Sequence, residues 1–170
     1  ADKTVNFVQP SSRSIALNTV PKGNISHIHG ALKANGRVFL INPSGIVFGS
    51  DAQVNVGGLL ASTLHLGAQE RFFSADESFL FKGESSGSII NNGDLRALNT
   101  SGDASVTLIA AQIENYGRIT ARHVGLAAGS QVRLDLGAGF SIAVEKAAID
   151  AKIEQGGAIQ AEGGRLILNA

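Results

Sequence analysis

The chain has 170 residues, of which 44% are hydrophobic and 16% charged, and its formal net charge is zero. This length suffices for one domain with its own core, and the lack of a basic face argues against nucleic acid or an anionic membrane as the main partner. The absence of cysteine excludes disulfide bonds and thiolate metal sites. No run is long or apolar enough to span a membrane. The first residues lack the apolar segment of a signal peptide, so any such signal is absent from this chain.

Short runs rich in Val, Ile, Leu and Phe predict β-strands along the chain. In the first run, at 4–8, apolar and polar residues alternate poorly. This run suits a cap over the end of a repetitive fold, because the open edge of such a fold must be covered. Helical periodicity is nearly absent, and the best helical candidate is the Ala-rich segment 143–152. The clearest strand-like runs cover 4–8, 38–41, 46–48, 106–109, 132–136 and 166–168.

The turns between these runs share a pattern in which a polar residue and a Gly precede the next apolar run. Asn and Gly enter turns that need a positive φ at low cost. An imperfect repeat of about 20 to 25 residues, built from short strands and such turns, indicates a β-solenoid. The pattern occurs in "ANGRVFL" (34–40), "NPSGIVF" (42–48), "NVGGLLA" (55–61), "NNGDLRA" (91–97), "NYGRITA" (115–121) and "QGGAIQA" (155–161).

A parallel β-helix explains the composition, because stacked Val, Ile, Leu and Ala side chains fill its narrow core and leave little room for rings. The sequence has eight Phe, one Tyr and no Trp. A β-sandwich, which also consists of short strands and turns, is the alternative. A sandwich requires longer alternating strands and hairpin turns, and it does not explain the Asn/Gly spacing. The pattern therefore predicts an all-β fold and favours the β-helix.

Residues 65–86 break the pattern, since they contain four of the eight Phe and several charges. We expect this segment to leave the coil as an extra-helical β-hairpin, with strands at 71–74 and 78–83. Its rings would lie on an outer face, either packed onto the helix or exposed as a patch that binds a partner. The stretch 137–152 leaves room for a second excursion. The four rings are those of Phe72, Phe73, Phe79 and Phe81.

The segment 42–46 reads Asn-Pro-Ser-Gly-Ile and lies between two strand-like runs. Pro43 has a φ that suits the first corner position of a turn, and Gly45 permits a left-handed conformation. The Asn42 side chain can bind backbone amides that the turn leaves unpaired. The segment therefore predicts a sharp corner of one coil.

The block 31–64 around this corner closely resembles the secretion domain of two-partner secretion (TPS) exoproteins, the filamentous haemagglutinin-like and high-molecular-weight adhesin-like proteins of Gram-negative bacteria. Segments on both sides extend the resemblance to nearly the whole chain. Ser44 departs from the family, which most often has Asn at that position. The residues that match the family's motifs are Asn42, Pro43, Ser44, Gly45 and Ile46, followed by Phe48, Gly49, Asn55, Gly57, Gly58, Ala61, Ser62 and Thr63.

The resemblance implies a right-handed parallel β-helix that forms one domain over residues 1–170, within a much larger exoprotein. It implies export through the periplasm to the outside of a Gram-negative cell, and recognition by the POTRA domains of a cognate outer-membrane transporter (TpsB). The domain would be a monomer and would nucleate β-helix folding during export. Residues 42–46 would either shape the fold, which we favour, or contact the transporter directly. The full-length protein would be an adhesin, with a cytolysin, a contact-dependent toxin or a haem-acquisition protein as alternatives.

Other kinds of site find little support in the sequence. His27 and His29 have a spacing that can bind a metal, but no neighbouring residue in the sequence supplies a third ligand. An enzyme is the main rival hypothesis, because some β-helices cleave polysaccharides, yet such enzymes need clustered carboxylates. The sequence therefore predicts no catalytic residue, no metal site and no cofactor. Beyond Asp2, the Asp residues are scattered, at Asp51, Asp76, Asp94, Asp103, Asp135 and Asp150.

Overall fold

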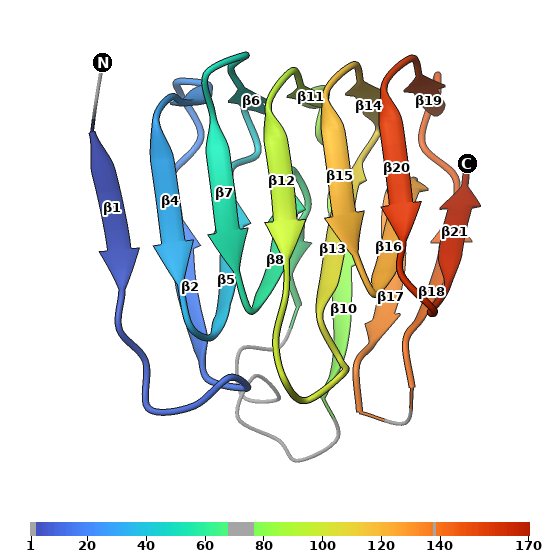
Figure 1. Cartoon of the computed structure of the whole chain (residues 1–170). Coiled ribbons are helices and arrows are strands. Elements are labelled where there is room, and N and C mark those ends of the chain that lie inside the picture. The colour runs from blue at the N-terminus through green and yellow to red at the C-terminus, as the bar shows by residue number, and fades with distance from the viewer. Residues whose placement is uncertain (1–2, 68–76, 138) are drawn as a thin grey trace.

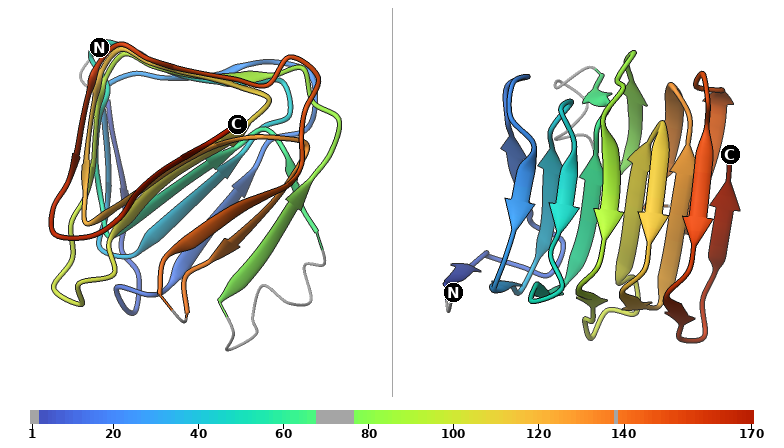
Figure 2. Two further views of the ribbon diagram at one scale, coloured as in Figure 1. Left: turned by 90° about the vertical axis from the view of Figure 1, so that its right-hand side faces the viewer. Right: turned by 90° about the horizontal axis from the view of Figure 1, so that it is seen from above.

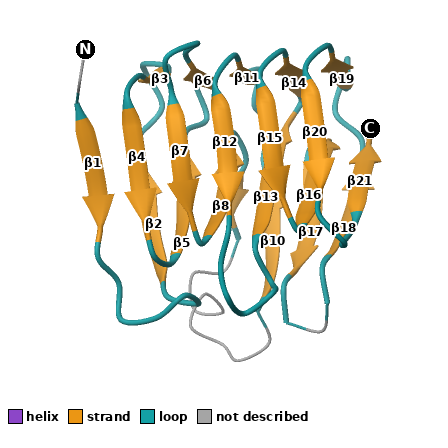
Figure 3. Ribbon diagram, in the orientation of Figure 1, coloured by secondary structure: helices purple, strands orange, loops and turns teal. Residues whose placement is uncertain are grey.

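The computed structural model describes residues 3–67, 77–137 and 139–170, and every regular element within them is a β-strand (Figure 3). The helix expected at 143–152 is wrong, because β18 (Ser141–Lys146) occupies its first part. Ile142 and Val144 are covered and alternate with exposed neighbours. This alternation is that of a strand, in which every second side chain points to the same face. Within the described residues no helix is long and apolar enough to cross a membrane.

Most strands form three parallel sheets that wrap into a tube of triangular cross-section (Figures 1 and 2). Sheet A contains β1 (Thr4–Phe7), β4 (Ala31–Ala34), β7 (Gln53–Val56), β12 (Asp94–Ala97), β15 (Arg118–Ala121) and β20 (Ala158–Ala161). Sheet B contains β2 (Ile15–Thr19), β5 (Arg37–Ile41), β8 (Gly58–Ser62), β13 (Ser105–Ala110), β16 (His123–Ala128) and β21 (Leu166–Asn169). Sheet C contains β3 (Ser26–Ile28), β6 (Ile46–Phe48), β11 (Ser88–Asn91), β14 (Gln112–Asn115) and β19 (Lys152–Gln155).

One strand from each sheet in turn makes one rung of the helix. Rung 1 is β1 to β3, rung 2 is β4 to β6, rung 3 is β7, β8 and β11, rung 4 is β12 to β14, rung 5 is β15, β16 and β19, and rung 6 is β20 and β21. Seen from the C-terminal end, the chain turns anticlockwise as it advances toward the viewer, so the helix is right-handed (Figure 2). At the N-terminal end, β1 is the outermost strand of sheet A and covers the edge of β4 in parallel register.

Stacked aliphatic side chains fill the tube. Equivalent inward positions of successive sheet A strands are aligned rung upon rung, and the residues there are buried or partly buried. Neighbouring strands lie about 4.8 Å apart, so aliphatic side chains at equivalent positions pack against one another. The predicted aliphatic core is therefore present. Its sheet A column is Leu32, Val54, Leu95, Ile119 and Ile159.

Glycines at the corner between sheets C and A are required by close packing of the rungs. Gly93, Gly117 and Gly157 occupy this corner in successive rungs, and none of them has a positive φ, contrary to the expectation from the sequence. A Cβ atom on Gly93 would lie 2.7 Å from the carbonyl oxygen of Ala52, and one on Gly117 would overlap the carbonyl oxygen of Gly93. Each glycine is needed because the backbone of the preceding rung passes where a side chain would begin.

A fourth sheet, D, lies outside the tube and covers the outer face of sheet B (Figure 2). It is antiparallel, in the order β18, β17 (Gln131–Asp135), β10 (Ser78–Lys82) and β9 (His65–Leu66). β9 and β10 belong to an excursion that leaves the coil after β8, and β17 and β18 belong to one that leaves after β16. Rung 4 has no excursion, since β13 passes to β14 through Ala111 alone.

The rings of Phe79 and Phe81 lie between sheets D and B, where they are 3% and 0% exposed. Phe79 meets Phe39 of sheet B edge to face, with ring centroids 5.4 Å apart. Packing onto the helix is therefore confirmed for these two rings, and the exposed patch is wrong for them. Phe72 and Phe73, with the strand expected at 71–74, lie outside the described residues.

Candidate functional site

Residues 42–46 form the corner between β5 and β6 in rung 2. The Gly45 amide donates a 3.1 Å hydrogen bond to the Asn42 carbonyl, which closes a β-turn with Pro43 at its first corner position. The Asn42 side-chain oxygen accepts a 2.9 Å hydrogen bond from the Ser44 amide. Gly45 has a φ of 125°, which side chains with a Cβ rarely adopt. This is the sharp turn that these residue types favour.

The Asn42 side chain also fastens rung 2 to its neighbours. Its Nδ2 donates 2.8 Å hydrogen bonds to the Asn24 carbonyl and to the Ser26 hydroxyl, both in rung 1. The backbone amide of Asn42 donates a 3.0 Å hydrogen bond to the Ser62 carbonyl of rung 3. Asn42 is 1% exposed, so leaving one of these polar groups unpaired would cost about 1–3 kcal/mol.

Neighbouring rungs cover this corner from both sides. The Ser44 hydroxyl accepts a 2.8 Å hydrogen bond from the Gly23 amide before rung 2, and the Ser85 hydroxyl donates to the Pro43 carbonyl at 2.7 Å. A Cβ atom on Gly87 would lie 2.5 Å from that same carbonyl oxygen. Ser44 is therefore half-buried, and the other four residues, Asn42, Pro43, Gly45 and Ile46, are buried.

The remaining family-matching residues do not gather into one site. Asn55 stands apart on the exposed outer face of sheet A. Gly49 makes room for a side chain, since a Cβ atom there would lie 2.5 Å from the His29 ring. The Ser62 hydroxyl accepts a 2.9 Å hydrogen bond from the Leu64 amide. The buried members of this set are Phe48, Gly49, Gly57, Gly58, Ala61, Ser62 and Thr63.

Gly58 makes room for a buried arginine that the sequence analysis missed, and Gly57 makes room for the backbone of the preceding rung at Asn35 and Gly36. A Cβ atom on Gly58 would lie 3.0 Å from Cγ of Arg37, and neither glycine has a positive φ. Arg37 is 2% exposed and donates to the carboxylates of Glu77, at 2.8 Å, and Asp103, at 3.1 Å. Its partners lie 40 and 66 residues away in the sequence. The only local signal is an arginine at the start of an otherwise apolar strand.

His27 and His29 have stacked rings, with centroids 6.5 Å apart, on an exposed face. Nδ1 of His29 lies 2.6 Å from Oδ1 of Asp51, a neighbour that the sequence analysis did not anticipate. The hydrogen bond to His29 lowers the pKa of the Asp51 carboxyl below its ordinary value. Within residues 3–67, 77–137 and 139–170, no group of three His, Cys, Asp or Glu side chains could hold a metal ion.

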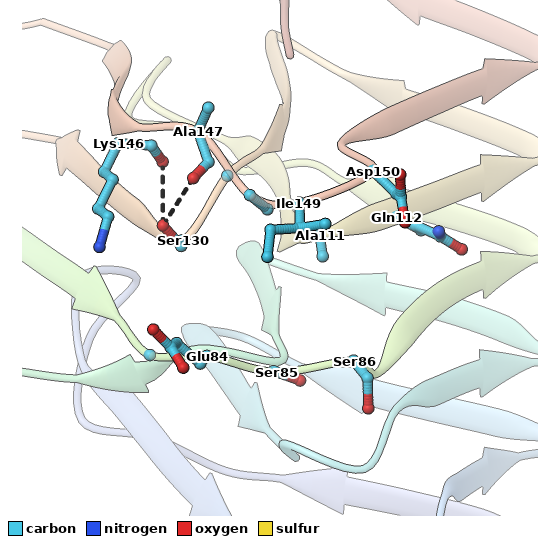
Figure 4. Close-up of a pocket in the computed structure, with 13 residues that line it drawn as sticks. Glu84, Ser85, Ser86, Ala111, Gln112, Ser130, Lys146, Ala147, Ile149 and Asp150 are labelled. Carbon is cyan, nitrogen blue, oxygen red and sulfur yellow. Dashed lines mark hydrogen bonds between the residues drawn. The ribbon is translucent and has the colours of Figure 1, made fainter.

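A groove of about 520 Å³ lies between the two excursions, over the corner where rung 4 has none (Figure 4). The segment 83–86 forms one wall, 147–150 forms the other, and Ala111 lies between them. The Ser130 hydroxyl donates to the Ala147 carbonyl at 2.9 Å, so it is bound to backbone and lacks the basic partner that a catalytic serine requires. The contacts of Ser130 therefore do not form the nucleophile-and-base pair of a serine active site.

The family model for the TPS secretion domain matches residues 1–170. The chain belongs to the TPS secretion domain family. The solved HMW1 secretion domain from Haemophilus influenzae matches 98% of this TPS domain and 46% of that chain, with a TM-score of 0.84 and 31% identity. The match shows that the two chains share a fold, and the right-handed parallel β-helix expected from the sequence is confirmed.

Two curated relatives of this TPS domain are heme/hemopexin-binding proteins. The one from Haemophilus influenzae (strain ATCC 51907 / DSM 11121 / KW20 / Rd) is 34% identical over 174 residues, 99% of this chain and 19% of the relative. The other, from Haemophilus influenzae, is 44% identical over 79 residues, 46% of this chain and 8% of the relative. The TPS domain thus spans a small part of much longer exoproteins. Such exoproteins are secreted through an outer-membrane transporter, which makes a cognate transporter the implied partner.

Proposed function

We propose that POTRA domains of the cognate outer-membrane transporter recognise this TPS domain, and that residues 42–46 act by shaping the fold. The burial of the corner carries the second part of this proposal. Asn42, Pro43, Gly45 and Ile46 are buried in the folded domain, and Ser44 donates and accepts hydrogen bonds within the chain. A transporter that met the folded domain would have almost no side chain of this corner to contact.

The fold also suits a domain that nucleates the folding of a longer β-helix during export. Each rung packs on the previous one, so folding can propagate as the chain emerges and burial can bias its movement outward. The Asn42 corner joins rungs 1, 2 and 3 at one point. The chain has no Cys, and so no disulfide can obstruct a narrow pore.

Secretion of the full exoprotein with Asn42→Ala or Gly45→Val tests the role of the corner. Both variants should lose secretion, because one removes the bonds between rungs and the other places a branched side chain at a φ of 125°. Asn115→Leu is the matched control, because it removes a buried amide at a distant corner. Asn55→Ala is the surface control and should be secreted normally.

If the corner acts through the fold, secretion should fall with stability in the same way for the corner variants and for Asn115→Leu. An Asn42→Ala domain that keeps the wild-type stability but loses secretion and POTRA binding would instead indicate direct contact. Binding of the isolated domain to purified POTRA domains, measured by titration, tests recognition itself. No binding at any accessible concentration would contradict it.

The activity of the whole exoprotein lies outside what this domain determines. The two heme/hemopexin-binding relatives favour haem acquisition, and the likeness to the HMW1 secretion domain is compatible with an adhesin. We propose a monomeric domain at the N-terminal part of a protein that acts outside the cell in one of these two roles. Haemin binding and epithelial cell binding by the secreted full-length protein would distinguish them.

A further inference from the structure

Sheet D is assembled from two excursions that are far apart in the chain. β10 pairs with β9 at only two positions, whereas it pairs with β17 at five, from Ser78 with Asp135 to Lys82 with Gln131. Leu80 and its partner Arg133 are 53 residues apart. All of rung 4, together with β15 and β16, therefore lies in the chain between the two halves of sheet D.

Because β17 and β18 follow all strands of rungs 1 to 4 in the chain, these rungs can stack before sheet D is complete. β5, β8 and β13 can pair with one another as soon as rung 4 is present. Until β17 and β18 arrive, only β9 and β10 can cover the outer face of sheet B, which carries the side chains of Phe39 and Leu60. In the complete domain these side chains are 2% and 1% exposed.

Arg37 joins this outer layer to the coil. It belongs to β5, and its guanidinium binds Glu77, the residue just before β10, and Asp103, in the loop before β13. Asp103 also binds Arg13 near the N-terminus, at 3.3 Å. Both carboxylates pair with this buried guanidinium, and they come from the outer layer and from rung 4, so the full set of ion pairs forms only when both parts are in place.

We propose that sheet D is a lid that closes after rungs 1 to 4 have stacked and that opens as a unit separate from the coil. Its closure covers the outer face of sheet B, and Arg37 is its latch. During export the lid would close once residues up to Lys146 are outside, which makes the passage of the domain hard to reverse. That consequence rests on the proposed function, whereas the lid is a property of the folded chain alone.

Native-state hydrogen exchange on the whole chain tests the lid without any transporter. Amides of β10 and β17 should exchange at least about tenfold faster than those of β8 and β13, through a partial opening. The double variant Leu80→Cys/Arg133→Cys places two cysteines at directly opposite positions of the antiparallel strands β10 and β17. Their Cα atoms lie within the span of a disulfide bond. The chain has no other Cys, so the reduced form of the same variant is its own control.

Oxidation should slow exchange in β10 and β17 by about tenfold or more and leave the sheet A strands β12 and β15 nearly unchanged. The isosteric variant Glu77→Gln should have the opposite effect, because it removes the charge that the latch binds. Lid and coil amides that exchange at one common rate, and that respond alike to the disulfide, would overturn the proposal. Loss of POTRA binding or of secretion would bear on the proposed function and not on the lid.

Discussion

The side-chain amide of Asn91 donates a 2.8 Å hydrogen bond to the side-chain oxygen of Asn115, its register partner in the next rung. Asn115 donates in turn to the side-chain oxygen of Gln155, also at 2.8 Å. The Asn91 oxygen accepts a 3.0 Å hydrogen bond from the Gly93 amide. Both asparagines are fully buried. The side-chain amides of Asn91, Asn115 and Gln155 therefore form a column of hydrogen bonds at the corner between sheets C and A.

Replacement of Asn115 by Leu should lower the free energy of unfolding by about 2 kcal/mol, because it removes the side-chain acceptor of the buried Asn91 amide, whereas water can replace the donor lost by the exposed Gln155. Urea unfolding followed by circular dichroism measures this change. Asn55→Ala, on the exposed face of sheet A, is the control and should change stability by less than about 0.5 kcal/mol. Equal stabilities for the two variants would show that the column does not stabilise the fold.

Gly117→Ala should destabilise the domain by about 3 kcal/mol or more, because the added Cβ overlaps the backbone carbonyl of Gly93, which cannot rotate away as a side chain can. Gly163→Asn is the matched control. Gly163 has a φ of 73° and open space around it, and Asn tolerates that conformation at a cost of about 1 kcal/mol or less. Thermal unfolding of both variants decides whether space or φ selects glycine at the corner of sheets C and A.

Asn42→Asp should be nearly as damaging as Asn42→Ala. Aspartate keeps the oxygen that accepts from the Ser44 amide, but it loses the two donors to the Asn24 carbonyl and the Ser26 hydroxyl and faces the Asn24 carbonyl with a negative charge. We expect each variant to lose about 2 kcal/mol or more of stability in urea unfolding. Full stability of the aspartate variant would mean that only the turn itself needs Asn42.

Stability should fall as the pH drops below about 6.5, the ordinary pKa of histidine, in part because of His123. Burial, followed by the charges of Arg122 and Arg165, lowers the pKa of His123, against a smaller opposite effect of Asp103. Its Nδ1 accepts a 3.1 Å hydrogen bond from the Arg165 amide, which a ring protonated at Nδ1 cannot accept. The unfolded chain therefore binds this proton more readily than the folded chain does.

The urea midpoint of the wild type should be lower at about pH 5.5 than at about pH 7.5, and His123→Gln should reduce that difference. A nuclear magnetic resonance titration of the His123 ring measures its pKa directly. A value at or above that of an unfolded histidine would contradict the assignment. The ring of Phe140, stacked on His123 with centroids 5.2 Å apart, provides part of its cover.

The repetitive part of the molecule follows from local sequence alone. Short aliphatic runs separated by Asn and Gly predict a coil, because each rung repeats the same local demands and buries its side chains on the next rung. Leu95 and Ile119, or Asn91 and Asn115, occupy equivalent places in successive repeats. The corner at Asn42 follows from the same local chemistry of turns, together with the resemblance of its block to the TPS family.

The strands outside the coil and the need for certain glycines depend on contacts between segments that are distant in the chain. The pairing of Leu80 with Arg133, and of Arg37 with Glu77 and Asp103, joins residues of different rungs, and no local pattern encodes such partners. The same holds for Gly117, whose need for space comes from the backbone of the rung before it. Local propensity governs a turn or a strand, whereas these features depend on which backbone the stacked rungs bring close.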